Sequence, residues 1–336
     1  MKMKHYFLAI VALMVSMSAS AQSNNTFADE RMSLSGYLQG GFQMAESGDT
    51  FYLKRARVSL TGNAREEKID YRLQVDMAGQ PKICDLYFRY KPSSELGMQL
   101  GQFKIPFAIE NDLYGPTTVE MIDYSYITTL LARNNSRYDG IASTGRDIGF
   151  QLFGGFGEQN GYKTLSYNVG VFNGSGINTA DNNDAMDFVA RLIYKPSKEL
   201  SLSGSVMATE TKTELSTIKS DRWALGAIYD VEDFMFRGEY AGAEFDTGND
   251  YDVNTFYLLG GYKLDKEWML VARYEALNQN YATTDYHSDR VTLGAVYKPY
   301  SFLRFQLNYS LEQTGLKDST DRTKASGLNL MLTAIF

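Results

Sequence analysis

The sequence predicts an all-β fold: a closed antiparallel transmembrane β-barrel of about 16 strands with an inward-folded third loop. Three observations support this prediction. The chain begins with an export signal, apolar and polar side chains alternate along most of its length, and its later connections alternate between short and long. Together they describe a chain that is exported and then crosses a membrane with strands.

The N-terminus has the three parts of a secretory signal. Lys2 and Lys4 form a basic segment, residues 7–17 are an apolar run, and the small residues Ala19-Ser20-Ala21 follow. The apolar run is too short to span a bilayer as a helix. We therefore expect residues 1–21 to be a signal peptide, 22–32 a short periplasmic segment, and 33–336 the barrel.

Composition agrees with a barrel that contacts lipid. The chain has 24 Tyr and 19 Phe, as the aromatic girdles of such barrels require, and Cys84 is its only cysteine. After the signal no stretch reaches the ~18–20 consecutive apolar residues of a spanning helix. We expect no cofactor, no metal site and no nucleic-acid partner.

Two-residue alternation is the main structural signal. Leu303, Phe305 and Leu307 interleave with polar residues, and the same pattern recurs in segments bounded by turn residues. The predicted strands are 33–45, 51–64, 69–77, 84–90, 96–104, 147–156, 165–173, 187–195, 200–210, 222–231, 234–244, 253–264, 267–279, 290–298, 303–312 and 326–336. No amphipathic helix is available to cover their apolar faces, so lipid is the expected partner.

The connections after the eighth strand alternate in length. The short ones are 196–199, 232–233, 265–266 and 299–302, and the long ones are 211–221, 245–252, 280–289 and 313–325. Short periplasmic turns and longer outer loops are typical of outer-membrane barrels. The final strand ends in Phe336 on an apolar face, which resembles the closing strand read by the barrel-insertion machinery. We expect the chain to reside in the outer membrane of a Gram-negative bacterium.

One connection is much longer than the others. Residues 105–146 separate the fifth strand from the sixth, and a loop of that length usually has a function. After the fifth of about 16 strands, it is expected to fold inward and narrow the channel. A wholly extracellular flap is the alternative.

Successive side chains of a strand point to opposite faces, so the parity of a residue number within a strand predicts which charges face the lumen. The inward set is Arg55, Arg57, Arg72, Arg89, Arg191, Arg237, Arg273, Arg290, Arg304, Asp70, Asp76, Asp85, Asp147, Asp187, Glu239, Glu275 and Glu312. These charges nearly balance, which suits a water-filled lumen with a transverse field. Because the inward arginines are only partly neutralised by inward acids, we expect weak anion selectivity. This selectivity should shift towards cations in Arg55→Ala and Arg57→Ala.

Residues 51–110 resemble the phosphate-selective porin O and P family. The resemblance rests on four segments in order, FYLKRARVSLTG, IDYRLQVDMA, CDLYFRYKP and LGQFKIPFAIE. It implies a trimeric outer-membrane channel in which basic residues pass phosphate-like anions. By position it places Arg55, Arg57 and Lys104 near the constriction, with Asp76 beside them. The residues expected to line the pore or bind anions are Arg55, Arg57, Arg72, Asp76, Arg89, Lys104, Glu110 and Arg133.

These observations favour a porin for passive diffusion of small hydrophilic solutes and ions, with a preference for anions or phosphate implied by the resemblance. A structural or adhesive barrel with a closed lumen is one alternative, and a channel for hydrophobic substrates is another. An enzyme is not expected. The run His287-Ser288-Asp289 holds the residue types of a catalytic triad, but triad members must meet through their side chains rather than follow one another in sequence.

Overall fold

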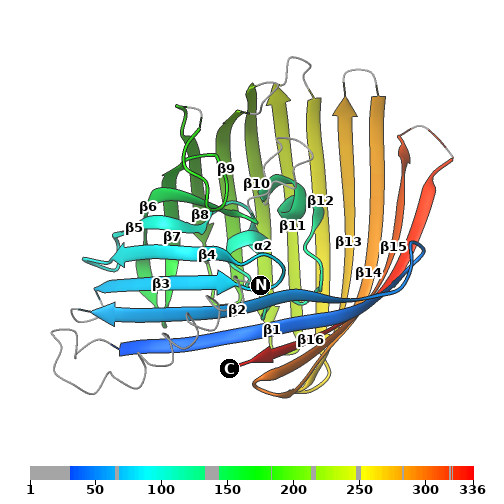
Figure 1. The fold of residues 1–336 in the computed structure, drawn as a ribbon, viewed down its shortest axis with the longest axis horizontal. Coiled ribbons are helices and arrows are strands. Elements are labelled where there is room, and N and C mark those ends of the chain that lie inside the picture. Colours follow the sequence, from blue (N-terminus) through cyan, green and yellow to red (C-terminus); the bar gives the residue numbers. More distant parts are fainter. Residues whose placement is uncertain are drawn as a thin grey trace, which may run out of the picture.

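The computed structural model describes residues 31–64, 68–132, 144–182, 184–212, 217–246, 251–281, 284–317, 319 and 321–336. The expected signal peptide, residues 22–30 and Arg133 lie outside these ranges. Within them, sixteen strands form one closed antiparallel barrel (Figure 1). The strands are β1 Arg31–Ala45, β2 Thr50–Ala64, β3 Ile69–Asp76, β4 Lys82–Tyr90, β5 Gly97–Lys104, β6 Arg146–Gln159, β7 Tyr162–Phe172, β8 Asp187–Tyr194, β9 Leu200–Lys212, β10 Thr217–Val231, β11 Phe234–Asp246, β12 Tyr251–Lys263, β13 Trp268–Tyr281, β14 Thr284–Tyr300, β15 Leu303–Leu316 and β16 Thr323–Ile335.

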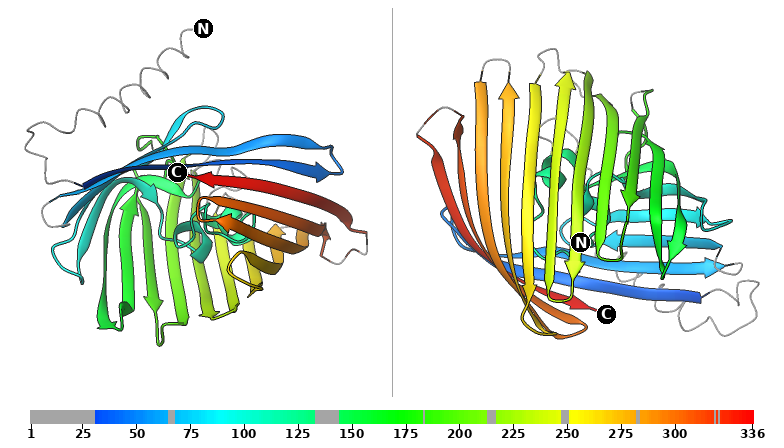
Figure 2. Two further views of the ribbon diagram at one scale, coloured as in Figure 1. Left: turned by 90° about the horizontal axis from the view of Figure 1, so that it is seen from below. Right: turned by 180° about the vertical axis from the view of Figure 1, so that it is seen from behind.

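The first and last strands close the barrel. The Gly36 N–H donates to the Phe336 carbonyl at 2.7 Å, and the Phe336 N–H donates back to the Gly36 carbonyl at 2.9 Å. Figure 2 shows β1, in blue, beside β16, in red. Because closure leaves no unpaired strand edge, the backbone polar groups are satisfied without water, as a bilayer requires.

All sixteen predicted strands are present in the predicted order, which confirms the fold class. Several strands extend further than predicted at the ends that carry the outer loops: β14 begins at Thr284, not at residue 290. His287, expected in an outer loop, therefore lies in β14 opposite Asn278. Residues 31 and 32, expected in the periplasmic segment, belong to β1.

The barrel presents apolar side chains outward and polar side chains inward. On β10, Leu225 is 61% exposed whereas Arg222 is 2% exposed. Aromatic pairs such as Trp268–Tyr297, with ring centroids 4.3 Å apart, lie near the turn ends of the strands. This inversion of the usual soluble pattern is what lipid around the wall and a polar lumen require. Among the described residues, no helix is both long and apolar enough to cross a membrane.

The connection after β5 enters the barrel. Its described residues are 105–132 and 144–145, and the first range includes the short helix α2 Ile109–Asp112 and the π-helix η1 Ile127–Ala132. Figure 1 shows α2 surrounded by strands. We call residues 105–132 the lumen segment. Its apolar side chains, including Phe107 and Leu131, pack with inward residues such as Val253 to form the main apolar core.

Cys84 departs from the alternation of its strand. It has the same parity as Leu86 and Phe88, which are exposed on the lipid side, but its own side chain is fully buried. The pairing of β3 with β4 shifts between Gln74 and Val75, so that Cys84 is an extra residue in a β-bulge. The extra residue shifts the inward and outward alternation of the strand by one position, so that Ile83 faces outward again. Alternation read from the sequence alone does not reveal such a shift.

Candidate functional site

A cavity of about 430 Å³ lies in the lumen between the lumen segment and the wall formed by β1–β7. We call it the lumen cavity. Its basic lining residues are Arg57, Arg72, Arg89, Lys104 and Arg146, and its acidic ones are Asp85 and Asp112. Four amide residues, four aromatic residues and residues 115–117 of the long connection after β5 complete the lining. The open space thus borders five basic groups and two acidic ones.

Two acidic side chains on this wall are each shared between two bases. Asp85 lies 2.7 Å from Arg146 Nε and 3.4 Å from Arg72 Nε. Near the turn ends of the same strands, Asp70 lies 2.6 Å from Arg89 Nε and 3.0 Å from Lys91 Nζ. Each of these two clusters contains two bases and one acid and so carries one net positive charge. Both clusters therefore attract anions.

Arg57 forms a separate ion pair with Asp76. Its Nε donates to Asp76 at 2.8 Å, and both side chains are almost fully buried. Asp76 also accepts the backbone N–H groups of Ala56 and Ala78, each at 3.1 Å. Asp76 therefore orients Arg57 and offsets its charge, and it does not itself line the lumen cavity.

Arg55 and Lys104 hold the lumen segment. Arg55 donates to Gln39 Oε1 at 2.7 Å, and its guanidinium carbon lies 6.0 Å from the centre of the Tyr124 ring. Lys104 Nζ donates to the Tyr114 carbonyl at 3.3 Å. Lys104 also borders the lumen cavity, whereas Arg55 lies outside it at the junction of the segment with the wall.

Glu110 does not line the open channel, which corrects the expectation for this residue. Its side chain is fully buried, 3.2 Å from Arg237 and 3.8 Å from Arg273, and it accepts the Ser125 N–H at 2.8 Å. Burial alone would raise the pKa of this carboxyl, but the two guanidinium groups and the Ser125 N–H hold it below its usual range. Glu110 is an internal anchor of the lumen segment.

Further contacts attach the segment to the opposite wall. Arg304 donates to the carbonyls of Thr117 and Val119 at 2.8 and 2.6 Å, and Glu239 accepts the Ile109 N–H at 2.8 Å. Several charges predicted by parity to face water are therefore covered. The covered set includes Arg237, Arg273, Arg304, Glu239 and Glu275. The balance of charge predicted for the whole lumen becomes a basic excess in the space that stays open.

Sequence reasoning did not assign a site role to Arg146, Asp112, Tyr87 or Phe153, all of which border the lumen cavity. Inward parity on β4 and β6 was the available signal for the two aromatic residues. Asp112 belongs to α2, and its carboxylate lies 2.6 Å from Arg191 of β8. That position depends on the path of the lumen segment, for which local sequence has no signal.

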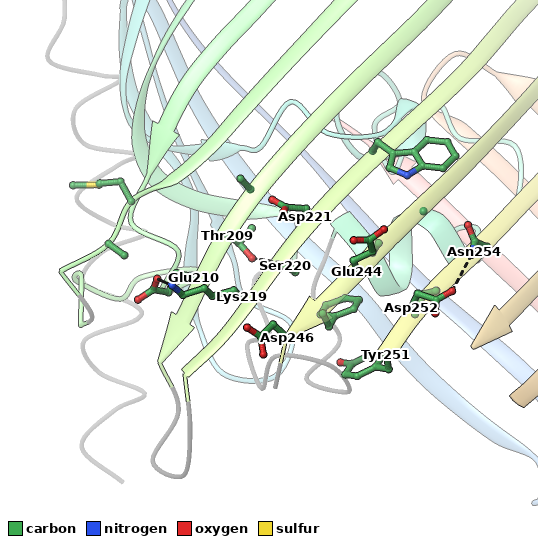
Figure 3. Close-up of a pocket in the computed structure, with 18 residues that line it drawn as sticks. Thr209, Glu210, Lys219, Ser220, Asp221, Glu244, Asp246, Tyr251, Asp252 and Asn254 are labelled. Atoms are coloured by element: carbon green, nitrogen blue, oxygen red, sulfur yellow. Dashed lines mark hydrogen bonds and ion pairs between the residues drawn. The ribbon is translucent and has the colours of Figure 1, made fainter. Parts of the chain in front are cut away.

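A larger cavity, of about 730 Å³, opens mainly on the outer face of β9–β12 near their loop ends (Figure 3). Its labelled charged residues are Glu210, Lys219, Asp221, Glu244, Asp246 and Asp252. Outward side chains such as Asp221 alternate here with inward, buried ones such as Ser220. Across the residues that the structure describes, no group of three or more His, Cys, Asp or Glu side chains is arranged to hold a metal ion.

Comparison with solved structures supports the fold. The anion-selective porin from Comamonas acidovorans is 15% identical, with a TM-score of 0.73 over 92% of this chain and 100% of its own. The trimer form of OmpT from Vibrio cholerae is 14% identical, with a TM-score of 0.70 over 91% of this chain and 99% of its own. The outer membrane channel DcaP of Acinetobacter baumannii is 15% identical, with a TM-score of 0.70 over 94% of this chain and 99% of its own. No curated protein sequence matches the chain.

The family model described as phosphate-selective porin O and P matches residues 35–336. That match covers the barrel except for residues 31–34 at the start of β1, well beyond the stretch of 51–110 that carries the resemblance in sequence. It agrees with the sixteen-stranded fold and with a polar lumen behind an apolar outer wall. The chain therefore belongs to the phosphate-selective porin O and P family and is an outer-membrane channel for small solutes.

Proposed function

We propose that this channel prefers small anions, which diffuse past the basic wall of the lumen cavity. The observation that carries the proposal is the excess of five basic over two acidic groups around that cavity. Charges beside a narrow, low-dielectric wall act more strongly on a passing ion than charges at a wide mouth. The name of the Comamonas porin records anion selectivity for a relative of the same fold.

Reversal potentials across planar bilayers under a KCl gradient test this proposal. Arg72→Gln and Arg146→Gln each remove one lining charge and should shift the reversal potential towards cations. For a charge about 8 Å from the ion in a water-like dielectric, the effect is ~0.5 kcal/mol, a roughly twofold change in permeability ratio. The shift should shrink at 1 M salt, where the screening length falls to about 3 Å.

Lys219→Gln is the matched control, because it removes one positive charge from an exposed site on the outer wall. It should leave the reversal potential unchanged. If the wild type shows no anion preference at low salt, or if the control shifts as much as the two lumen variants, the proposal is wrong.

We also propose that three copies of the chain assemble, with the interface on the outer wall of the early strands. Phe51 and Leu53 on β2 are 84% and 81% exposed, the two highest values among the described large apolar side chains that face outward. A relative of the same fold is described as a trimer. Light scattering in mild detergent tests this: a mass of one chain plus bound detergent would contradict it.

A further inference from the structure

Two aromatic rings flank one base of the lumen cavity. The guanidinium carbon of Arg89 lies 5.2 Å from the centre of the Tyr87 ring and 6.0 Å from that of Phe153. Tyr87 and Arg89 are two residues apart on β4 and so share its inner face, and Phe153 belongs to β6. All three border the lumen cavity.

A glycine on the strand between them makes this arrangement possible. Gly97 of β5 pairs with Phe153, and a Cβ at Gly97 would come 2.4 Å from Cζ of the Phe153 ring. Any larger residue at position 97 would displace the ring from Arg89. The Phe153 ring thus lies across β5 towards β4.

The three side chains are partly exposed to the cavity, and Arg89 keeps hydrogen-bond donors that neither ring can accept. Tyr87 and Phe153 are partly exposed, and 36% of the Arg89 side chain is exposed. Arg89 uses Nε to donate to Asp70, at 2.6 Å. The terminal nitrogens of the guanidinium are the atoms left to meet an anion from the cavity. A hydrated inorganic anion gains nothing from two aromatic rings beside such a base, whereas an organic anion with a flat ring does.

We propose that Arg89, Tyr87 and Phe153 form a selectivity site for aromatic carboxylates. This inference rests on the proposed anion preference and adds the shape of the preferred solute. The carboxylate would accept hydrogen bonds from the terminal nitrogens of Arg89, and the aromatic ring of the solute would pack against Tyr87 or Phe153. A cavity of about 430 Å³ has room for a solute of this size.

Block of the chloride current in planar bilayers tests the inference with three probes of equal charge: benzoate, cyclohexanecarboxylate and acetate. Benzoate and cyclohexanecarboxylate are similar in size, but only benzoate has a planar π-system. The half-blocking concentration of benzoate should be roughly threefold to tenfold lower than that of cyclohexanecarboxylate, the range expected for one aromatic contact. Acetate should block least.

The variants Tyr87→Leu and Phe153→Leu should each reduce the difference between benzoate and cyclohexanecarboxylate, and Tyr87→Phe should preserve it. Phe88→Leu is the matched control, because Phe88 adjoins Tyr87 on β4 but is 61% exposed on the outer face. It should leave the block unchanged. The wild-type comparison and Tyr87→Phe keep the test decisive even if a leucine variant fails to fold.

Equal half-blocking concentrations of benzoate and cyclohexanecarboxylate in the wild type would overturn the inference. So would a benzoate preference that survives both leucine substitutions. The reversal potential in KCl, measured in the same membranes, reports on charge alone. A reversal potential without anion preference would contradict the proposed function. A reversal potential that shows anion preference, together with equal block by benzoate and cyclohexanecarboxylate, would contradict only the aromatic site.

Discussion

Single basic residues of the lumen wall differ in how strongly their charge can act on an ion in the channel. Arg57 and Arg55 are both buried, but only Arg57 borders the lumen cavity, and Asp76 at 2.8 Å offsets its charge. Arg55 lies at the junction with the lumen segment and donates to Gln39. Both had been expected to line the pore on the basis of strand parity. Parity identifies the inner face but does not tell which inner residues the segment covers.

Removing these two arginines should therefore have unequal effects. Arg57→Ala leaves Asp76 without its partner beside the cavity, and it should shift the reversal potential towards cations by roughly twofold in permeability ratio at low salt. Arg55→Ala should shift it less and should instead loosen the contact with Tyr124. Bilayer recordings of both variants at 0.1 M and 1 M KCl would check this, and an equal or larger shift in Arg55→Ala would contradict it.

At the scale of elements, the lumen segment is positioned by buried charge. Glu110 contacts Arg237 from 127 residues away in sequence, and Arg222 donates to the Leu131 carbonyl at 2.6 Å. Loss of one member of a buried ion pair leaves the other without compensation, which costs about 3–5 kcal/mol. The segment should therefore hold its place by electrostatics as well as by its apolar core.

Glu110→Gln should release the segment at neutral pH. The folded-state pKa of Glu110 is lowered, so its contribution to stability is full above the ordinary value of about 4.3 and is lost as the pH falls through the lowered folded value. Wild-type protein should thus keep the Ser125 amide protected from hydrogen exchange between pH 7 and pH 5. In Glu110→Gln that amide should exchange on the order of a hundred times faster once intrinsic rates are divided out. The exposed turn variant Glu199→Gln should match the wild type, and equal protection in Glu110→Gln would contradict the anchoring role.

Strand number and order were predictable because alternation reports directly on two faces, lipid and lumen, that differ in polarity. Strand length was not, because beyond the bilayer both faces are polar and residues such as His287 and Asn278 pair without an alternating signal. The inner location of Arg57, Arg72 and Arg89 followed from parity as well. The burial of Glu110 did not, because it depends on contacts with β11 and β13 that local sequence does not encode.

For the whole molecule, closure depends on the seam between β1 and β16. A Cβ at Gly36 would lie 2.6 Å from the Arg57 carbonyl and 2.5 Å from the Phe336 ring, whereas a Cβ at Gly40 would have 3.5 Å to its nearest neighbours. Gly36→Val should therefore destabilise the barrel by about 1–3 kcal/mol, the usual effect of overpacking, and Gly40→Val should change it little. The temperature at which the compact band in SDS gels converts to the unfolded band measures this. Equal transition temperatures for the two variants would show that the seam is not close-packed at Gly36.

The sharing of Asp85 between Arg72 and Arg146 has a consequence for the speed of transit. In the empty channel the carboxylate already occupies part of the hydrogen-bonding capacity of both bases, so an arriving anion must compete with a fixed neighbour of the same charge. The same holds for Asp70 beside Arg89 and Lys91. Competition of this kind shortens the dwell time of each ion without abolishing attraction into the lumen, and rapid conduction requires both entry and release. A wall of unshared arginines would hold anions longer and carry fewer of them per second.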